Sequence, residues 1–402
     1  ERAVFLRLED AARELAMRYG YAPIETPMFE GSAVFERGVG EVTDVVEKEL
    51  FRVQAGRGES ERERWALRPE PTAGLARAYV QHGMRTWPQP VKLTMTGPMF
   101  RYDRPQAGRY RQFWQFDVEA IGDAGPAIDA EIIELAMAFF AEVGLTDVQV
   151  LVNSIGDGAC RPAYIGELQA YFRDYEADLP ELERDRLETA PLRLLDSKDE
   201  RMAELIAGAP VIPEHLCADC QAHFDGLLAH LEGVSIEPRL EASLVRGLDY
   251  YTRTAFEFYR SGAEGQQQAL GGGGRYDGLV EQLGGPPTAG IGFALGLERI
   301  LLACDAEGVF RGPPATPSVF VVDLTGGLVA LELVDQLGRV CVGVDRAYDQ
   351  RSLKSQLRAA NRSGAPIAVI IGEDEVAAGV ATVSDLLAGV QTSVARDDLI
   401  EH

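Results

Sequence analysis

The sequence predicts an α+β protein in which an antiparallel sheet flanked by helices is followed by a smaller α/β unit. Apolar and polar residues alternate in VKLTMT (91–96) and in FWQFDVE (113–119), which is the period of strands with one buried face. Helical periodicity at 127–143 predicts a helix that covers the back of this sheet. After a Pro/Gly-rich linker at 311–317, short apolar strands alternate with helices, which indicates a largely parallel sheet.

The N-terminal elements follow from the same patterns. A helix is expected over about 4–19, and the next stretch, APIETPMFE, has extended character. WALRPEPTAGLARAYV (65–80) predicts a strand, a turn with two prolines, and a helix whose N-cap is Thr72. The strand at 91–96 is expected to break at Gly97-Pro98, because proline cannot donate a ladder hydrogen bond.

The character of the chain changes twice. From 157 to 238 it is charged and helical, which predicts a helical insertion domain between two parts of the sheet-bearing domain, 1–156 and 239–312. The α/β pattern then occupies 317–402 and predicts a separate C-terminal domain.

Composition limits the class of protein. Apolar residues make up 46% of the 402 residues and charged residues 25%, which is ordinary globular usage. No apolar run reaches the roughly 18 residues that span a bilayer, and the charged N-terminus is unlike a signal peptide, so a cytoplasmic protein is expected. Five cysteines fit a reducing compartment. A net charge of −24 argues against a protein that coats nucleic acid, and any RNA contact would need local basic patches.

The most informative segment is FRYDRPQAGRYRQFWQFDVEAIG (100–122). Its Gly/Pro loop carries four arginines, whose planar guanidinium groups suit phosphate. In the strand that follows, amide and carboxylate side chains share one face, and Trp114, Phe116 and Val118 share the other. The apolar face can pack and the polar face can accept hydrogen bonds from an amine. This combination suggests a nucleotide beside an amino acid.

This segment resembles motif 2 of the class II aminoacyl-tRNA synthetases, and its residue sequence is similar to that of the histidyl-tRNA synthetases. LVRGLDYYTRTAFEF (244–258) resembles the histidine-binding signature of that family. GGGGRYDGL (271–279) and GIGFALGLER (290–299) resemble its second signature and class II motif 3. The resemblance implies a class II catalytic domain and, at 317–402, an anticodon-binding domain. It also implies a preceding R/G-T-x-D-x-x-P segment that this sequence lacks.

The implied reaction joins histidine to ATP as an adenylate and then transfers the aminoacyl group to histidine tRNA. By resemblance, Arg101 would bridge the α-phosphate and the amino-acid carboxylate, and Arg246 would be the second α-phosphate arginine and touch histidine. Phe113 would stack on adenine, with Arg299 over the opposite face or clamping the phosphates. The residues that the resemblance assigns to ATP are Arg101, Asp103, Arg109, Phe113 and Arg299. Without it, Phe113 could be a core residue and Arg246 half of a buried ion pair.

The resemblance also implies a pocket for the imidazole amino acid. Neutral imidazole offers one N–H donor and one acceptor nitrogen, which Glu119 and Tyr251 would satisfy. The α-amino group would be held by Glu70, Thr72 and Gln115. Tyr250 would line the pocket, and the glycine run 271–274 would permit close approach of the backbone. A loop carboxylate near a helix start is the alternative interpretation of Glu70.

Partners are implied in the same way. Gln106 and Arg109 would meet the acceptor end of tRNA, and Mg²⁺ would accompany ATP, with Glu298 as a loosely held protein ligand. A homodimer is implied by class II motif 1. Arg351, Lys354, Arg358 and Arg362 recur at helical spacing and form a basic stripe that could contact tRNA or be a solvated helix face.

His215, Cys217, Cys220 and His223 form a compact cluster in the insertion. One short helix cannot easily direct all four side chains at one point, so structural thiols are expected there and no resident metal. The chain has no GxxxxGK[ST] loop, and none of its five histidines lies near the signatures, which excludes a P-loop ATPase and a Ser-His-Asp hydrolase.

The main alternative to a synthetase is a regulatory paralogue that senses histidine without charging tRNA. Such paralogues typically lack the C-terminal domain and lose the arginines, whereas Arg101, Arg246 and Arg299 are all present here, together with 317–402. Another class IIa synthetase, such as the prolyl or threonyl enzyme, would have different pocket residues in place of RGLDYY.

Overall fold

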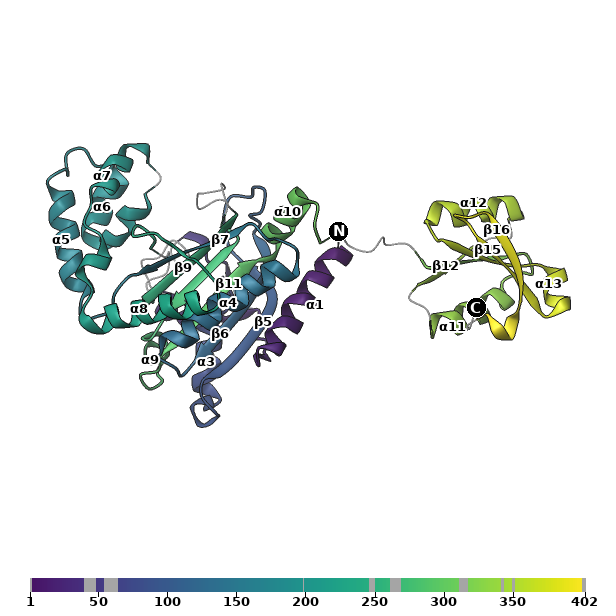
Figure 1. Cartoon of the computed structure of the whole chain (residues 1–402), viewed down its shortest axis with the longest axis horizontal. Coiled ribbons are helices and arrows are strands. Elements are labelled where there is room, and N and C mark those ends of the chain that lie inside the picture. Colours follow the sequence, from purple (N-terminus) through teal and green to yellow (C-terminus); the bar gives the residue numbers. More distant parts are fainter. Residues whose placement is uncertain are drawn as a thin grey trace. The chain divides into compact units, whose positions relative to one another are not determined.

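The computed structural model describes residues 2–39, 48–53, 64–197, 199–245, 250–260, 269–310, 317–340, 343–348 and 351–399. The chain divides into two compact units, 1–312 and 313–402 (Figure 1). The predicted α+β fold class is confirmed.

The first unit is built on an eight-stranded sheet. Its strand order is β1-β5-β6-β11-β10-β9-β7-β8, and every neighbouring pair is antiparallel except β1–β5 and β7–β8 at the two edges. The strands are β1 (Ala22–Pro23), β5 (Val91–Phe100), β6 (Gln112–Ile121), β7 (Val148–Ser154), β8 (Arg239–Leu240), β9 (Thr252–Arg260), β10 (Gly271–Arg275) and β11 (Gly290–Gly296).

Four helices bury the apolar face of this sheet. They are α1 (Arg2–Arg18), α4 (Pro126–Glu142), α8 (Ala218–Gly233) and α10 (Leu297–Glu307). Phe116 and Val118 of β6 are fully buried in this core, and Phe116 packs edge-to-face on Phe139 of α4 with ring centroids 4.9 Å apart. The other face of β6 is therefore left for polar residues, as its alternation predicts.

A second core lies around α3 (Thr72–Gln81) and the small sheet β2-β4-β3. The remaining elements of this region are β2 (Phe29–Gly31), α2 (Ser32–Val39), β3 (Arg52–Val53), β4 (Trp65–Leu67), a 3₁₀ turn at Met84–Thr86 and α9 (Leu279–Gln282). Arg68 is fully buried here, and its Nε donates to the carbonyl of Pro98 at 2.9 Å. Gly97 leaves room for this side chain, since a Cβ would lie 2.8 Å from Nη2.

Two local predictions fail here. β5 continues through Gly97-Pro98 to Phe100, and Pro98 pairs with Trp114, whose N–H donates to the Glu298 carboxylate at 2.9 and 3.0 Å. Pro98 and Trp114 therefore face each other without a ladder hydrogen bond, and the missing N–H of Pro98 removes no hydrogen bond between β5 and β6. Thr72 is not the N-cap of α3. The Glu70 carboxylate accepts from the backbone N–H groups of Thr72 and Ala73, both at 2.9 Å.

The predicted insertion contains α5 (Arg161–Arg173), α6 (Glu181–Thr189), α7 (Ala203–Ala207), α8, and 3₁₀ turns at Pro191–Asp196, Glu200–Met202 and Ile212–His215. In Figure 1, α5, α6 and α7 lie together beyond the sheet, whereas α8 crosses it beside α4. Phe224, Leu227 and Leu231 of α8 belong to the core of the sheet. The boundaries of the insertion remain a prediction.

The second unit is a five-stranded sheet of order β13-β12-β14-β15-β16. The strands β12 (Val319–Asp323), β13 (Val344–Arg346) and β14 (Ile367–Ile371) are parallel, and β15 (Val380–Asp385) and β16 (Val390–Ala395) extend the sheet in antiparallel fashion. The helices are α11 (Leu328–Gly338), α12 (Leu353–Ser363) and α13 (Glu373–Ala378), followed by a 3₁₀ turn at Arg396–Asp398. The prediction of an α/β domain holds, with a hairpin added at one edge.

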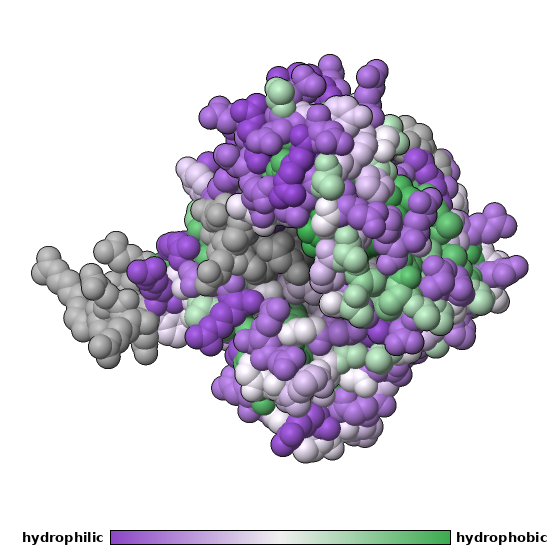
Figure 2. Space-filling view, turned by 90° about the vertical axis from the view of Figure 1, so that its left-hand side faces the viewer, coloured by the Kyte–Doolittle hydropathy of each residue, from purple (hydrophilic) through white to green (hydrophobic). Residues whose placement is uncertain are grey.

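The surface in Figure 2 is mostly hydrophilic, in keeping with the net charge of −24. None of the helices in the described residues combines the length and the apolar character needed to cross a bilayer.

Candidate functional site

A cavity of about 760 Å³ lies on the polar face of the large sheet. Strands β6, β10 and β11 contribute to its lining, together with the start of α3, the loop before β6 and the first turn of α10. The predicted residues that line it are Glu70, Thr72, Arg101, Asp103, Arg109, Phe113, Gln115, Glu119, Tyr250, Tyr251, Glu298 and Arg299. Arg246 lies outside the described residues. Segments far apart in the sequence therefore converge on one cavity.

The Glu119 carboxylate is the most constrained acceptor in this cavity. Thr72 Oγ1 donates to its Oε1 at 2.6 Å, and the Tyr276 hydroxyl donates to its Oε2 at 2.6 Å. Burial raises the pKa of Glu119 to about 8, against the two hydrogen bonds that lower it, and the nearby Glu70 raises it further. The carboxylate is held in one orientation and gains most from a ligand that brings an N–H donor.

Glycines make room for this arrangement. Gly292 of β11 pairs with Glu119 of β6, and a Cβ at 292 would overlap the Glu119 carboxylate. A Cβ at Gly290 would likewise overlap the Tyr276 ring. Tyr276 and Gly292 both lie in the signature segments 271–279 and 290–299, but no local pattern assigns them individual roles. Their roles follow from the pairing of β6, β11 and β10, which the sequence alone does not specify.

The amide and carboxylates beside Glu119 are also buried. Gln115 is 8% exposed and lines the cavity, and its Oε1 has no hydrogen-bond partner among the described residues. Burial also raises the pKa of Glu70, although its bonds to the start of α3 and the charge of Arg101 oppose the rise. Asp117, behind the cavity lining, is fully buried, and burial together with Glu119 and Glu70 raises its pKa well above the usual range. An ammonium group would relieve this excess of acceptors.

Three guanidinium groups line the part of the cavity formed by the loop between β5 and β6 and the first turn of α10. Burial lowers the pKa of Arg299, and the like charges of Arg109 and Arg101 lower it further. Arg299 donates to the carbonyls of Gly108 and Ala269, at 3.2 and 2.7 Å, which fixes its position. A group of mutually repelling cations in a cavity is a site for an anion, and guanidinium forks match phosphate oxygens.

Arg101 and Phe113 lie side by side in this part of the cavity. The Arg101 guanidinium carbon is 5.3 Å from the centroid of the Phe113 ring. Among the described residues, the Arg101 side chain donates only through Nε, to the carbonyl of Pro69 at 2.8 Å. Its two terminal nitrogens can therefore form a bidentate contact with a ligand.

The loop between β5 and β6 forms a tight hairpin. Gln106 and Arg109 form an isolated bridge, with N–H···O distances of 3.0 and 2.9 Å, and Arg109 pairs with Asp103 at 2.8 Å. Gln106 is exposed and does not line the cavity, whereas Asp103 and Arg109 do. The hairpin thus presents Gln106 outward and Arg109 inward.

Aromatic side chains close the end of the cavity near Glu119. Tyr250 and Tyr251 are 5% and 7% exposed, and their ring centroids are 4.6 Å apart. Tyr276 stands edge-to-face against Tyr250 at 5.9 Å. A wall of three tyrosines around a carboxylate suits a flat, hydrogen-bonding ring.

The predicted basic stripe lies in the second unit. Arg351, Lys354, Arg358 and Arg362 are all exposed, on α12 or just before it. Gln356 is buried on the other side of α12, where it exchanges hydrogen bonds with the backbone of Asp323 at 2.9 and 2.7 Å. Arg351 and Arg362 also line a cavity of about 390 Å³, together with the exposed Tyr348. The stripe is a solvent-facing cationic surface with an aromatic ring beside it.

Comparisons with known proteins identify the chain. A family model described as histidyl-tRNA synthetase matches residues 3–300, and one described as anticodon binding domain matches 319–402. The chain belongs to the histidyl-tRNA synthetase family. It is therefore an aminoacyl-tRNA ligase, as its motifs predicted.

The similarity to members of this family extends over nearly the whole chain. A histidine–tRNA ligase of Desulforudis audaxviator is 47% identical over 399 residues, which are 98% of this chain and 93% of that protein. One from Rhodococcus erythropolis is 45% identical over 409 residues, 100% of this chain and 95% of that protein. The crystal structure of apo histidyl-tRNA synthetase from S. aureus aligns with a TM-score of 0.82 and 33% identity, covering 100% of this chain and 95% of that one. The regulatory alternative is not favoured.

Proposed function

We propose that the cavity of the first unit binds histidine and ATP side by side and joins them as histidyl-adenylate, which then reacts with histidine tRNA. The observation that carries this proposal is the polarity of the cavity. A buried carboxylate held by Thr72 and Tyr276 lies at one end, and Arg101, Arg109 and Arg299 lie at the other. An amino acid with an N–H-bearing side chain and a polyphosphate match these two ends.

At the histidine end, Glu119 accepts the imidazole N–H, and Tyr251 contacts the other ring nitrogen. Gln115, Glu70 and Thr72 face the α-amino group. The unpartnered Oε1 of Gln115 supports this assignment, because a buried acceptor gains from a cationic donor. The hydroxyl–carboxylate network also supports selectivity, because an amino acid without the ring N–H would leave Glu119 buried and unsatisfied.

At the ATP end, Phe113 stacks on adenine, and Arg101 grips the α-phosphate and the histidine carboxylate together. Arg299 covers the base or clamps the outer phosphates, and Asp103 and Arg109 close the loop over them. Arg246 is assigned here by resemblance alone. A histidine carboxylate oxygen attacks the α-phosphorus and pyrophosphate leaves, so the protein contributes mainly alignment and charge stabilisation.

Mg²⁺ fits this cavity as a loosely held ion. The Glu298 carboxylate lines the cavity, and both of its oxygens already accept from the Trp114 N–H. It could offer a remaining lone pair, with phosphate oxygens and water completing the coordination. When bound, the ion neutralises charge on the phosphates, while this chain's arginines hold them in place.

Binding of tRNA is proposed to use both units. Gln106, exposed on the motif 2 hairpin, and Arg109 would meet the acceptor end, and the stripe of Arg351, Lys354 and Arg358 would contact the anticodon region. Two local cationic surfaces are the expected solution for an RNA-binding protein of net charge −24. A cytoplasmic homodimer is part of the same proposal.

ATP–pyrophosphate exchange with each of the amino acids tests the proposal. We expect exchange with histidine alone, followed by transfer to histidine tRNA in an aminoacylation assay. Exchange with a different amino acid would reject the assignment of the Glu119 end. Histidine binding without any exchange would instead favour the regulatory role.

A further inference from the structure

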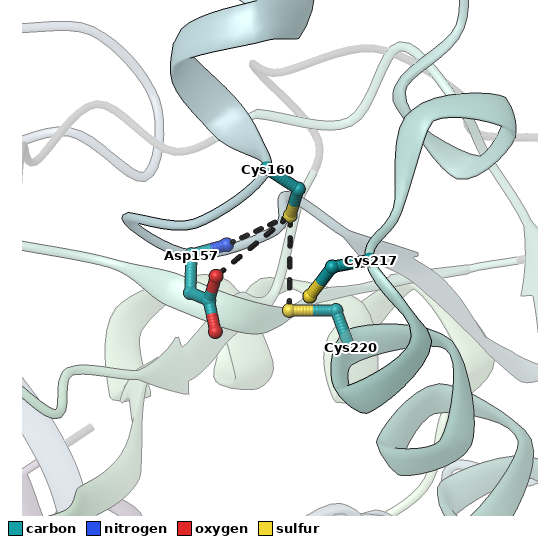
Figure 3. Close-up of side chains that lie close together, drawn as sticks. All are labelled: Asp157, Cys160, Cys217 and Cys220. Atoms are coloured by element: carbon teal, nitrogen blue, oxygen red, sulfur yellow. Dashed lines mark hydrogen bonds between the residues drawn. The ribbon is translucent and has the colours of Figure 1, made fainter.

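Four side chains from two separate parts of the chain meet at one point outside the active-site cavity (Figure 3). Asp157 and Cys160 lie in the loop between β7 and α5, and Cys217 and Cys220 lie at the start of α8. One ligand atom from each lies within 4.8 Å of all the others. The two histidines of the sequence cluster are elsewhere, because His223 bonds Asp129 at 2.9 Å and His215 is 3.5 Å from Glu167.

Two of the distances between these atoms match those expected in a tetrahedral metal site. The Sγ atoms of Cys160 and Cys220 are 3.8 Å apart, and Cys160 Sγ is 3.8 Å from Asp157 Oδ1. Tetrahedral Zn²⁺ with Zn–S bonds of about 2.3 Å places its sulfur ligands about 3.8 Å from one another. A cation at the centre would need little movement of the side chains.

Two of the sulfurs lie at helix starts. Cys160 and Cys217 are the N-cap residues of α5 and α8. The Asp157 N–H donates to Cys160 Sγ at 3.5 Å. Gly156 has φ +63°, and a Cβ there would lie 2.7 Å from Cys160 Sγ. The turn is shaped around this sulfur.

A disulfide explains the arrangement less well. It would join two of the sulfurs at about 2.05 Å, closer than the 3.8 Å between Cys160 and Cys220, and would leave a third cysteine and a carboxylate beside it without a role. All three cysteines are free thiols here. The presence of a fourth, hard ligand distinguishes a cation site from a redox pair.

We propose that Asp157, Cys160, Cys217 and Cys220 form a structural zinc site. Cys160 and Cys220 are buried, and Asp157 and Cys217 are half-buried. Four protein ligands fill a tetrahedral coordination sphere and leave no open position for catalysis. Three thiolates and a carboxylate leave an excess of negative charge around Zn²⁺, and the Arg253 guanidinium, 3.2 and 3.3 Å from Asp157 Oδ2, partly compensates it.

The site would position the histidine end of the cavity. Arg253 and the turn exchange backbone bonds, from the Arg253 N–H to Gly156 and from the Ile155 N–H to Arg253, both at 2.7 Å. Arg161, next to Cys160, donates to the carbonyl of Tyr251 at 2.7 Å. The metal thus holds α5, α8 and the segment that enters β9 in one arrangement, and Tyr251 is two residues from Arg253.

Elemental analysis of the purified full chain tests this inference. We expect close to one zinc per chain in the wild type, and loss of the metal in Cys160→Ser and in Cys217→Ser. Cys304→Ser is the matched control, because Cys304 is buried in α10, away from the cluster, and should retain the metal. Co²⁺ added to the chelated, reduced wild type should give the visible absorption of tetrahedral thiolate coordination.

The reconstitution arm needs no substitution, so it remains decisive even where a variant fails to fold. Absence of zinc in the isolated wild type, together with failure of the reduced protein to take up Zn²⁺ or Co²⁺, would overturn the proposal. An intact mass lower by two hydrogens, with an unreactive pair among these cysteines, would overturn it in favour of a disulfide. These readouts do not use aminoacylation, so the zinc site and the proposed function can fail separately.

Discussion

Replacing Gly292 with alanine tests the geometry of the histidine end. The added Cβ would overlap the Glu119 carboxylate and lie 2.5 Å from the carbonyl oxygen of Val118. The backbone there is fixed by pairing with both β6 and β10. The side chain of Glu119 must therefore move, and a shift of about 1 Å is enough to break the 2.6 Å bonds from Thr72 and Tyr276.

The expected magnitude follows from these contacts. The cationic substrate favours the ionised form of Glu119, and a hydrogen bond to a charged group contributes about 1.5–3 kcal/mol. A displaced Glu119 would lose this bond. We therefore expect kcat/KM for histidine in Gly292→Ala to fall by about 10- to 150-fold. The KM for ATP should change little, because the hydrogen bonds that Glu119 accepts come from Thr72 and Tyr276 and not from Arg101, Arg109 or Arg299.

ATP–pyrophosphate exchange at varied histidine concentration measures this effect, with thermal unfolding as a check on the fold. Gly31→Ala is the control, since Gly31 is also a strand glycine and a Cβ there would meet nothing within 4 Å. Wild-type kinetics in a folded Gly292→Ala would refute the placement of Glu119. An equal loss in both variants would indicate a general effect of losing glycine.

Three further outcomes follow. The pKa of Glu119 is raised from 4.5 to about 8, so between these pH values the folded state retains a proton that the unfolded state loses. The free energy of unfolding therefore falls as the pH rises from about 4.5 to 8, by at most about 1.4 kcal/mol per pH unit. The free energy of unfolding measured in urea should rise for Glu119→Gln relative to the wild type as the pH is raised from 5 to 8. Arg101→Lys, which loses the bidentate fork, should lower kcat in exchange at least about tenfold. Charge reversal at Lys354 and Arg358 should raise the KM for tRNA in aminoacylation and leave exchange unchanged.

Each has a contrary result. Parallel stability curves for wild type and Glu119→Gln would mean that Glu119 titrates normally in the folded protein. An active Arg101→Lys would show that a point charge is sufficient at that position. If reversal at Lys354 and Arg358 weakened exchange as much as aminoacylation, a folding defect would explain both, and a circular dichroism spectrum would reveal it.

The polar face of β6 could be predicted because its alternation is a local property. Phe113, Gln115 and Glu119 face the cavity, while Phe116 is buried in the core. The predicted strand break at Pro98 is wrong. Proline ends a strand where its missing N–H would have to donate to the neighbouring strand, and the β5–β6 pairing requires no such hydrogen bond at Pro98. A rule based on one residue fails where the pairing with the neighbouring strand determines the structure.

The residues that the sequence did not reveal act through distant partners. Tyr276 reaches Glu119 only because β10 and β6 flank β11. Asp157 and Cys160 join the C-x-x-C pair only because the chain that leaves β7 meets the start of α8. The spacing of Cys217 and Cys220 suggested a cluster, but it pointed to His215 and His223 as companions, and those lie elsewhere. The topology of the fold instead brings Asp157 and Cys160 next to this pair.

The glycine strand β10 restricts how this enzyme could change. Gly271, Gly272 and Gly274 line the cavity, and a Cβ at Gly274 would lie 2.5 Å from the Thr254 carbonyl. A pocket bounded there by bare main chain cannot be enlarged by trimming a side chain, and it cannot be narrowed without disturbing the sheet. Directed evolution toward bulkier substrates would therefore have to act on the tyrosine wall.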